Sequence, residues 1–182
     1  TTIARMQDVL ARQKKAFLTD APPSAELRTD RINRVIALLL DNQQKLCESL
    51  ATDFTWRSHD QSLMSDILLP VAALKYARKN LSQWMKPERR RPEMRLGLLG
   101  AKAEIHFQPI GSVGIMTPWN FPIAIALAPL AEVFAAGNRA MISLSDLSPT
   151  TANLLIELLA TKFDDTELAA FVTPLLLTVP PD

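Results

Sequence analysis

The amino-acid sequence predicts an α/β fold, in which an N-terminal helical segment is followed by an incomplete doubly wound (Rossmann-like) parallel sheet. Over roughly the first 90 residues, apolar side chains recur at steps of three and four, the period of amphipathic helices. Beyond residue 110, short apolar runs alternate with helical patterns in the order β-α-β-α-β, with short connections. That order predicts parallel strands joined by right-handed crossovers.

Composition narrows the class of protein further. The 182 residues carry 20 basic and 19 acidic side chains; 48% of them are hydrophobic and 21% are charged. These proportions exclude disorder as the dominant state. The single cysteine, Cys47, excludes a disulfide framework, and no apolar run reaches the length of about 18 residues that a membrane span needs. The first residues show no apolar signal-peptide core, so we expect a cytoplasmic protein.

Three amphipathic helical segments are expected before residue 90, over residues 3–18, 25–50 and 59–85. Ser24 is the expected N-cap of the second segment, which reads as one long helix. The third opens with Ser58 and Gln61 at the spacing of a capping box. Pro70 lies inside this third segment and should kink it or split it in two.

A charged run and one strand are expected between the helices and the parallel sheet. Prolines and glutamates interrupt the basic residues of the run at 86–95, which contains no aromatic side chain. We therefore interpret it as a solvated linker and expect no nucleic-acid binding. Residues 104–108 alternate between polar and apolar side chains, which predicts a half-buried antiparallel strand with His106 on its polar side.

The second part of the chain is expected to alternate between strands and helices, at residues 111–117, 121–136, 139–144, 151–163 and 168–172. Gly137 and Asn138 give a strong stop signal after the first of these helices. Ser148 is the expected N-cap of the second, with Pro149 at its first helical position. The run from residue 168 begins a third parallel strand.

One loop stands out as a candidate site. Residues 117–122 follow the first parallel strand, at the end of the sheet where open α/β folds bind ligands. Asn120 could donate an amide N–H to a developing oxyanion, a role typically worth about 3 kcal/mol. On spacing alone, a capping role for Asn120 and a packing role for Trp119 are the more common alternative. No metal site is expected, because His59 and His106 are far apart and lack further ligands at metal spacing.

Two segments resemble the aldehyde dehydrogenase superfamily. They are residues 109–122 (PIGSVGIMTPWNFP) and residues 135–149 (AAGNRAMISLSDLSP). Within the family, the resemblance is nearest to the coniferyl-aldehyde dehydrogenase group. It is suggested by Leu69-Pro70 and by the amino-acid sequences of residues 84–87 and 138–142. The resemblance implies a division into an N-terminal helical region with an antiparallel edge strand, the first part of a dinucleotide-binding domain, and an unmatched tail, at residues 1–108, 109–172 and 173–182.

The resemblance also implies a set of site residues. Asn120 becomes an oxyanion donor for an aldehyde substrate. The residues on the side of an NAD or NADP cofactor become Met116, Thr117, Pro118, Trp119, Ser143 and Asp146. Ser143 stands where the family carries a lysine that reaches the adenosine ribose or a 2′-phosphate. Losing that charged hydrogen bond, worth about 1.5–3 kcal/mol, should weaken cofactor binding by roughly one to two orders of magnitude.

The chain departs from the family in what it lacks. The family's nucleophilic cysteine and general-base glutamate belong to positions beyond the resembling segments, and Cys47, expected to be a small core hydrophobe, does not replace the nucleophile. We therefore expect an N-terminal portion of an NAD(P)-dependent aldehyde dehydrogenase that is inactive alone and binds NAD or NADP weakly or not at all. We also expect self-association through an unpaired sheet edge and apolar surface. The alternative is a truncated, non-catalytic homologue that acts as an interaction protein.

Overall fold

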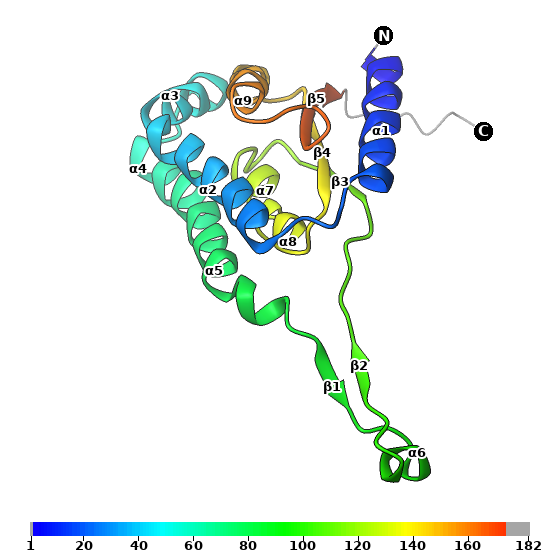
Figure 1. Cartoon of the computed structure of the whole chain (residues 1–182). Helices are drawn as coiled ribbons and strands as arrows, with labels where there is room; N and C mark the ends of the chain where they lie inside the picture. Colours follow the sequence, from blue (N-terminus) through cyan, green and yellow to red (C-terminus); the bar gives the residue numbers. More distant parts are fainter. Residues whose placement is uncertain (1, 174–182) are drawn as a thin grey trace, which may run out of the picture.

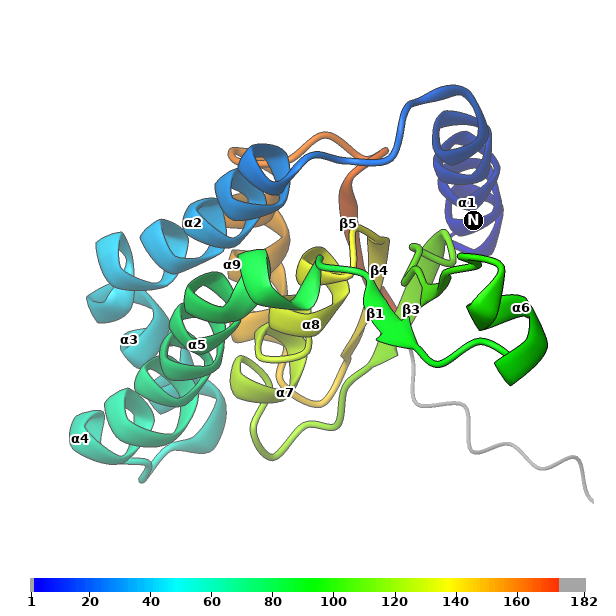
Figure 2. The same ribbon diagram turned by 60° about the horizontal axis from the view of Figure 1, so that its bottom comes forward.

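A three-stranded parallel sheet lies between helix α1 on one face and the other large helices on the opposite face (Figures 1 and 2). The computed structural model describes residues 2–173, so all but the first residue of the tail expected at 173–182 lies outside the described residues. The sheet has the order β3-β4-β5, with strands Ser112–Met116, Arg139–Ser145 and Leu168–Thr173. The three strands lie where the apolar runs predicted them and are parallel, which confirms the predicted α/β class.

The helices of the first part are α1 (Thr2–Thr19), α2 (Ala25–Asp41), α3 (Gln43–Phe54), α4 (His59–Ser62), the π-helical turn η1 (Leu63–Leu68) and α5 (Leu69–Trp84). The single helix expected over residues 25–50 is wrong, since the chain breaks at Asn42 between α2 and α3. The Asn42 side chain donates to the Leu38 carbonyl at 2.9 Å. Asparagine competes in this way with the backbone donor that would continue the helix.

The third helical segment is split as expected. Pro70 falls in the first turn of α5, directly after the wider π turn of η1. Proline has no N–H to donate and its ring collides with the carbonyl four residues back, and a widened turn relieves both problems. The predicted cap is also present, because Ser58 Oγ accepts a hydrogen bond from the Gln61 N–H at 3.1 Å.

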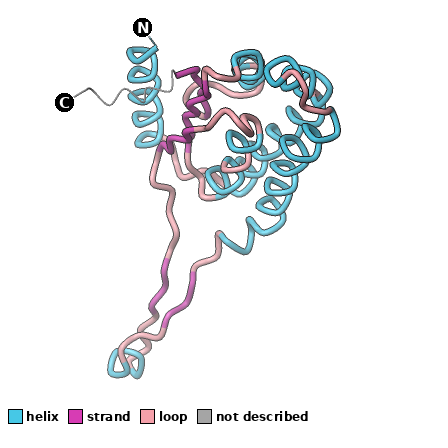
Figure 3. The backbone as a smooth tube through the Cα atoms, turned by 180° about the vertical axis from the view of Figure 1, so that it is seen from behind, coloured by secondary structure: helices cyan, strands magenta, loops and turns pink. Residues whose placement is uncertain are grey.

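A long arm projects from the body (Figures 1 and 3). It consists of β1 (Glu88–Arg90), the short helix α6 (Met94–Leu98) and β2 (Ala103–Ile105). The strands pair antiparallel, with Arg89 opposite Glu104. Residues 86–95 are almost all exposed, as expected for a solvated segment, but they are not a simple linker, because β1 lies within them. The antiparallel strand expected at 104–108 is present, but it is shorter and mostly exposed rather than half-buried. His106 lies outside it and is exposed.

The expected helix over residues 121–136 is two short helices, α7 (Ala124–Leu127) and α8 (Leu130–Ala135), separated at Pro129. Gly137 ends α8 with a φ of 85°, where a Cβ would lie 2.8 Å from the guanidinium carbon of Arg28. The positive φ favours glycine, and a Cβ there would also displace the Arg28 guanidinium.

Helix α9 (Pro149–Ala160) begins as expected, but Ser148 does not cap it with its side chain. Instead, the Asp53 carboxylate, at the end of α3, accepts hydrogen bonds from the N–H groups of Thr150 and Thr151 at 3.0 and 2.8 Å. The free donors at the helix N-terminus are satisfied from another helix, which ties α3 to α9.

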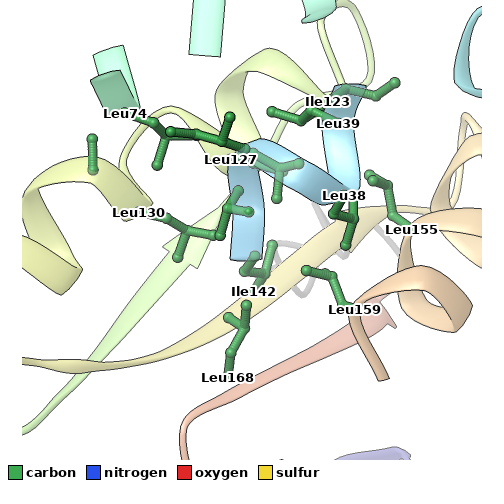
Figure 4. Packing of buried hydrophobic residues seen from close by; sticks show 14 of the residues in the cluster. Leu38, Leu39, Leu74, Ile123, Leu127, Leu130, Ile142, Leu155, Leu159 and Leu168 are labelled. Atoms are coloured by element: carbon green, nitrogen blue, oxygen red, sulfur yellow. The ribbon is translucent and has the colours of Figure 1, made fainter. Parts of the chain in front are cut away.

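The main core lies between the helices and one face of the sheet (Figure 4). Its members come from α2, α3, η1, α5, α7, α8, α9 and all three strands of the parallel sheet. They include Leu38, Leu39, Leu74, Ile123, Leu127, Leu130, Ile142, Leu155, Leu159 and Leu168. Helix α1 covers the other face, where Val9 packs against Ala169 and Phe171. Among residues 2–173, no helix combines the length and apolarity needed to cross a bilayer.

Candidate functional site

The carboxyl ends of β3 and β4 bring the two predicted site segments together. Met116 pairs with Ser143 in the register of the sheet. Just beyond, the N–H and the hydroxyl of Thr117 both donate to the carbonyl oxygen of Ser143, at 3.0 and 3.1 Å. Since both segments are fixed to one edge of a packed sheet, a ligand lying across them would contact a rigid surface.

The side chains of this edge differ in their exposure to solvent. Met116, Pro118, Asn120 and Asp146 are exposed, while Thr117 is buried under the loop. The Ser143 hydroxyl is hydrogen bonded to the hydroxyl of Thr173 on β5. The edge therefore presents amide, carboxylate and thioether groups to solvent, but no cation at position 143.

Asn120 has a side-chain amide without a hydrogen-bond partner among the described residues. It does not cap α7, which begins at Ala124 and whose first N–H groups bind Asp66. The capping alternative is therefore excluded. Trp119, the other residue of that alternative, is only half-buried and stacks on Phe54, with ring centroids 6.2 Å apart.

Two apolar grooves flank the loop. One, of about 260 Å³, lies between α1 and the sheet and is lined by Met6, Leu10, Met116, Met141, Ser143 and Phe171 among others. The second, of about 500 Å³, lies beside α7. It is lined by Ser65, Leu69, Phe121, Ala124, Ile125, Ala128 and Pro129. The loop that carries Asn120 thus connects Met116 in the first groove to Phe121 in the second. Sequence reasoning found neither groove, because each is assembled from separate elements.

Two charged residues that the sequence analysis missed hold this loop. Arg57 donates from Nη1 to the Asn120 carbonyl at 2.9 Å, and it forms a buried ion pair with Asp66. Neither residue belongs to a recognisable motif. Their roles depend on contacts between segments about 60 residues apart, so no local sequence signal could have identified them.

Cys47 lies away from this edge, in α3. Its side chain is 1% exposed, and burial raises the pKa of its thiol, with a further rise caused by Asp66. A reactive cysteine needs the opposite conditions, a lowered pKa and access to substrate. Within residues 2–173, no group of three or more His, Cys, Asp or Glu side chains is placed to hold a metal ion.

The sequence of this chain is similar to sequences of one known protein family. A model described as the aldehyde dehydrogenase family matches residues 2–173. The chain is 47% identical, over 171 residues, to a probable coniferyl aldehyde dehydrogenase of Caulobacter vibrioides, covering 93% of this chain and 35% of that protein. It is 46% identical to a coniferyl aldehyde dehydrogenase of a Pseudomonas species, covering 90% and 33%. The chain thus spans about a third of the length of these curated relatives.

Solved structures agree on the fold. A substrate-bound Staphylococcus aureus AldH superposes with a TM-score of 0.86 at 24% identity, covering 92% of this chain and 36% of that one. An apo indole-3-acetaldehyde dehydrogenase gives a TM-score of 0.77 at 22% identity, covering 94% and 38%. The fold of this chain is therefore shared by parts of these larger proteins.

Proposed function

Because the chain belongs to the aldehyde dehydrogenase family, we propose that it supplies part of the active site of an NAD(P)-dependent enzyme that oxidises an aldehyde to the acid. The observation that carries the proposal is the edge where Met116, Thr117 and Ser143 meet, with the unpartnered amide of Asn120 on the adjoining loop. In open α/β sheets, this edge is where ligands bind.

Asn120 is the proposed oxyanion donor. Its side chain is exposed and has no partner among the described residues, so it is available to a developing negative charge on the aldehyde oxygen. Its backbone carbonyl accepts a hydrogen bond from Arg57. A donor fixed before the reaction stabilises the charge without a cost for reorganisation, and such a donor is typically worth about 3 kcal/mol.

The cofactor side is proposed to comprise Met116, Thr117, Pro118, Trp119, Ser143 and Asp146. These residues suit part of a dinucleotide: exposed backbone and apolar surface at the strand end, and an exposed carboxylate at Asp146 that can accept hydrogen bonds from ribose hydroxyls. The nicotinamide supplies the hydride acceptor when it is bound. Ser143 provides no cation, so we expect a 2′-phosphate to be held less well than the unmodified ribose.

An aromatic aldehyde is the proposed substrate class, coniferyl aldehyde or a related compound. The second groove offers the phenyl ring of Phe121 and the small side chains of Ala124 and Ala128, with Ser65 as its polar lining residue. Flat apolar rings fit such walls through stacking and burial of apolar surface. Two relatives are named for coniferyl aldehyde, which supports the same class.

The substrate proposal is tested by saturation-transfer NMR of the 182-residue chain with coniferyl aldehyde and with hexanal. Ring protons of coniferyl aldehyde should receive saturation, and Phe121→Ala should reduce the effect severalfold. Phe107→Ala, which removes an exposed ring from the arm, is the matched control and should change nothing. Equal saturation of hexanal, or a response of the control as large as that of Phe121→Ala, would reject the aromatic assignment.

Turnover is a separate question. We expect the 182 residues alone not to oxidise aldehydes, because their one thiol, Cys47, is buried in α3 with a raised pKa. An absorbance assay for NADH or NADPH with aromatic aldehydes should show no rate above the background without protein. A rate of NADH or NADPH formation clearly above that background would contradict this expectation.

An interaction protein is the second candidate function. It is favoured by the arm, whose tip exposes Leu98 and Leu99 and whose strand region exposes Phe107. Exposed apolar clusters of this kind mark contact surfaces. The two candidates separate in the NMR titration: an interaction protein would show no saturation of the aromatic aldehyde and would still self-associate.

A further inference from the structure

Two charged side chains from the helical part of the chain are buried against the loop that carries Asn120. The side chains of Arg57 and Asp66 are 6% and 0% exposed, and they form an ion pair. Removing two charges from water is costly, so a buried pair is weak evidence for stability in itself. The hydrogen bonds of this pair to the loop that carries Asn120 indicate a second role for it.

Arg57 connects three partners. Its Nη1 donates to the carbonyl oxygen of Asn120 at 2.9 Å, and its Nη2 donates to Ser65 Oγ at 3.0 Å and to the Asp66 carboxylate. The guanidinium also lies over the rings of Phe54 and Phe121, 5.2 and 5.0 Å from their centroids. Since a guanidinium is planar and its donors are fixed, these contacts set the position of the Asn120 carbonyl in three dimensions.

Asp66 holds the other end of the same loop. Its Oδ1 accepts hydrogen bonds from the N–H groups of Ile123 and Ala124, both at 3.2 Å, while its Oδ2 binds Arg57. One carboxylate therefore joins the start of α7 to the arginine that holds Asn120. The segment between these attachments is only a few residues long.

The backbone that leads to Arg57 is strained. Thr55 has φ 56° and ψ −41°, and the Trp56 N–H donates to the Phe54 carbonyl at 2.6 Å, which makes a γ-turn of the rare kind with positive φ. A β-branched residue seldom adopts this conformation. Strain of this kind persists where the surroundings fix it, and it gathers at functional sites. The turn ends α3 abruptly and places Arg57 two residues later beneath the loop.

We propose that Arg57 and Asp66, here called the Arg57–Asp66 clamp, are positioning residues that fix the direction of the Asn120 amide. The clamp fastens the Asn120 peptide and the first turn of α7 to the helical part, which leaves the amide side chain as the free end of a rigid loop. The proposal rests on the oxyanion role of Asn120, but the position of the loop can be measured without any ligand.

The test uses the double variant Arg57→Met, Asp66→Asn in the full chain. The amide introduced at position 66 can still accept from Ile123 and Ala124 and needs no counter-charge, so the fold is preserved while the bond to the Asn120 carbonyl is lost. The chain is labelled with 5-fluorotryptophan and read by ¹⁹F NMR and by hydrogen exchange. Arg78→Met is the matched control, because Arg78 is an exposed arginine that donates to Asn33.

We expect the Trp119 resonance to move toward that of free fluorotryptophan and the amides of residues 117–124 to exchange at least tenfold faster. The Trp84 resonance and the amides of β4 should be unchanged, and so should every signal in Arg78→Met. The single variant Arg57→Lys should restore part of the Trp119 shift, since lysine can reach one acceptor at a time.

Two outcomes would overturn the clamp. An unmoved Trp119 signal with unchanged exchange in the loop would show that the loop keeps its position without Arg57. A uniform acceleration that includes β4 would show a purely structural role. The aldehyde titration reports separately on Asn120: reduced saturation in Asn120→Ala, with an intact loop signature, supports contact between its amide and the aldehyde carbonyl, and unchanged saturation counts against that contact but not against the clamp.

Discussion

At the scale of single residues, charged side chains make many of the connections between segments far apart in the sequence. Glu167 lies just before β5, and its carboxylate accepts from Arg31 and Arg34 of α2 at 2.9 and 2.8 Å. Burial alone would raise the pKa of Glu167, but the hydrogen bonds from Arg34 and Arg31 outweigh it and lower the pKa below its ordinary value. The contact therefore makes stability depend on pH.

The lowered pKa of Glu167 determines the direction in which stability changes with pH. The stabilisation is present above the unfolded pKa of Glu167 and is lost as the pH falls through the folded pKa. At pH 7, Glu167→Gln should reduce the free energy of unfolding by about 2 kcal/mol, and the difference should shrink toward zero in acid. Urea denaturation at several pH values measures this. Glu157→Gln, an exposed glutamate on α9, is the control; an equal loss there would refute the assignment.

Ser143 allows a residue-scale prediction about the cofactor. A lysine at this position adds a cation at the sheet edge, where a charged hydrogen bond is worth about 1.5–3 kcal/mol. Ser143→Lys should therefore tighten binding of NAD at least tenfold, and of NADP by more, measured by isothermal titration. Asn153→Lys adds the same charge on exposed α9 and should change neither. Unchanged affinity in Ser143→Lys would remove position 143 from the cofactor side.

At the scale of elements, the parallel sheet was the most predictable part. Its strands are continuous apolar runs, because helices cover both faces, and such runs are visible in the sequence. Strand β1 has no such signal: its three residues are charged and exposed, and only their antiparallel pairing with β2 defines it. The break at Asn42 was missed because the apolar period continues across it. The position of the candidate loop at the end of β3 was predictable, whereas the contacts of Arg57 and Asp66 with it were not, since they join segments far apart in the sequence.

The joint between α3 and α9 gives a prediction at this scale. Asp53→Ala removes the acceptor for the Thr150 and Thr151 N–H groups and should cost about 1–2 kcal/mol of stability. Ser148→Ala should cost almost nothing, because the buried Ser148 hydroxyl has no hydrogen-bond partner in the described part of the chain. Thermal unfolding of the two variants side by side provides the measurement. A larger loss in Ser148→Ala would mean that serine is the functional cap after all.

At the scale of the whole molecule, apolar surface is concentrated on the arm. Leu98 and Leu99 are each 84% exposed at its tip. In residues 2–173, the outer edges of β3 and β5 are also unpaired. Self-association could therefore use either the apolar arm or an unpaired strand edge. Helix α1 already covers part of the second sheet face, so we expect self-association to use the arm.

We predict that Leu98→Ser with Leu99→Ser shifts the chain toward monomer in sedimentation velocity at micromolar concentration. Leu18→Ser, at a leucine of α1 that is 82% exposed, is the matched control and should leave the distribution unchanged. Association that survives the arm variant would assign the contact to a strand edge. A monomeric unmodified chain would contradict self-association itself.

Helix α1 packs against β5, although the two lie at opposite ends of the described chain. Gln13 donates to the carbonyls of Ala140 and Asp165, the second of these 152 positions away. Contacts of such high sequence separation slow folding, because a long loop must close before they form. During synthesis at about 5–20 residues per second, α1 emerges from the ribosome roughly 8–30 s before its partner strand. The apolar face of α1 stays without its partner strand through that interval, so α1 docks onto the sheet long after it has been made.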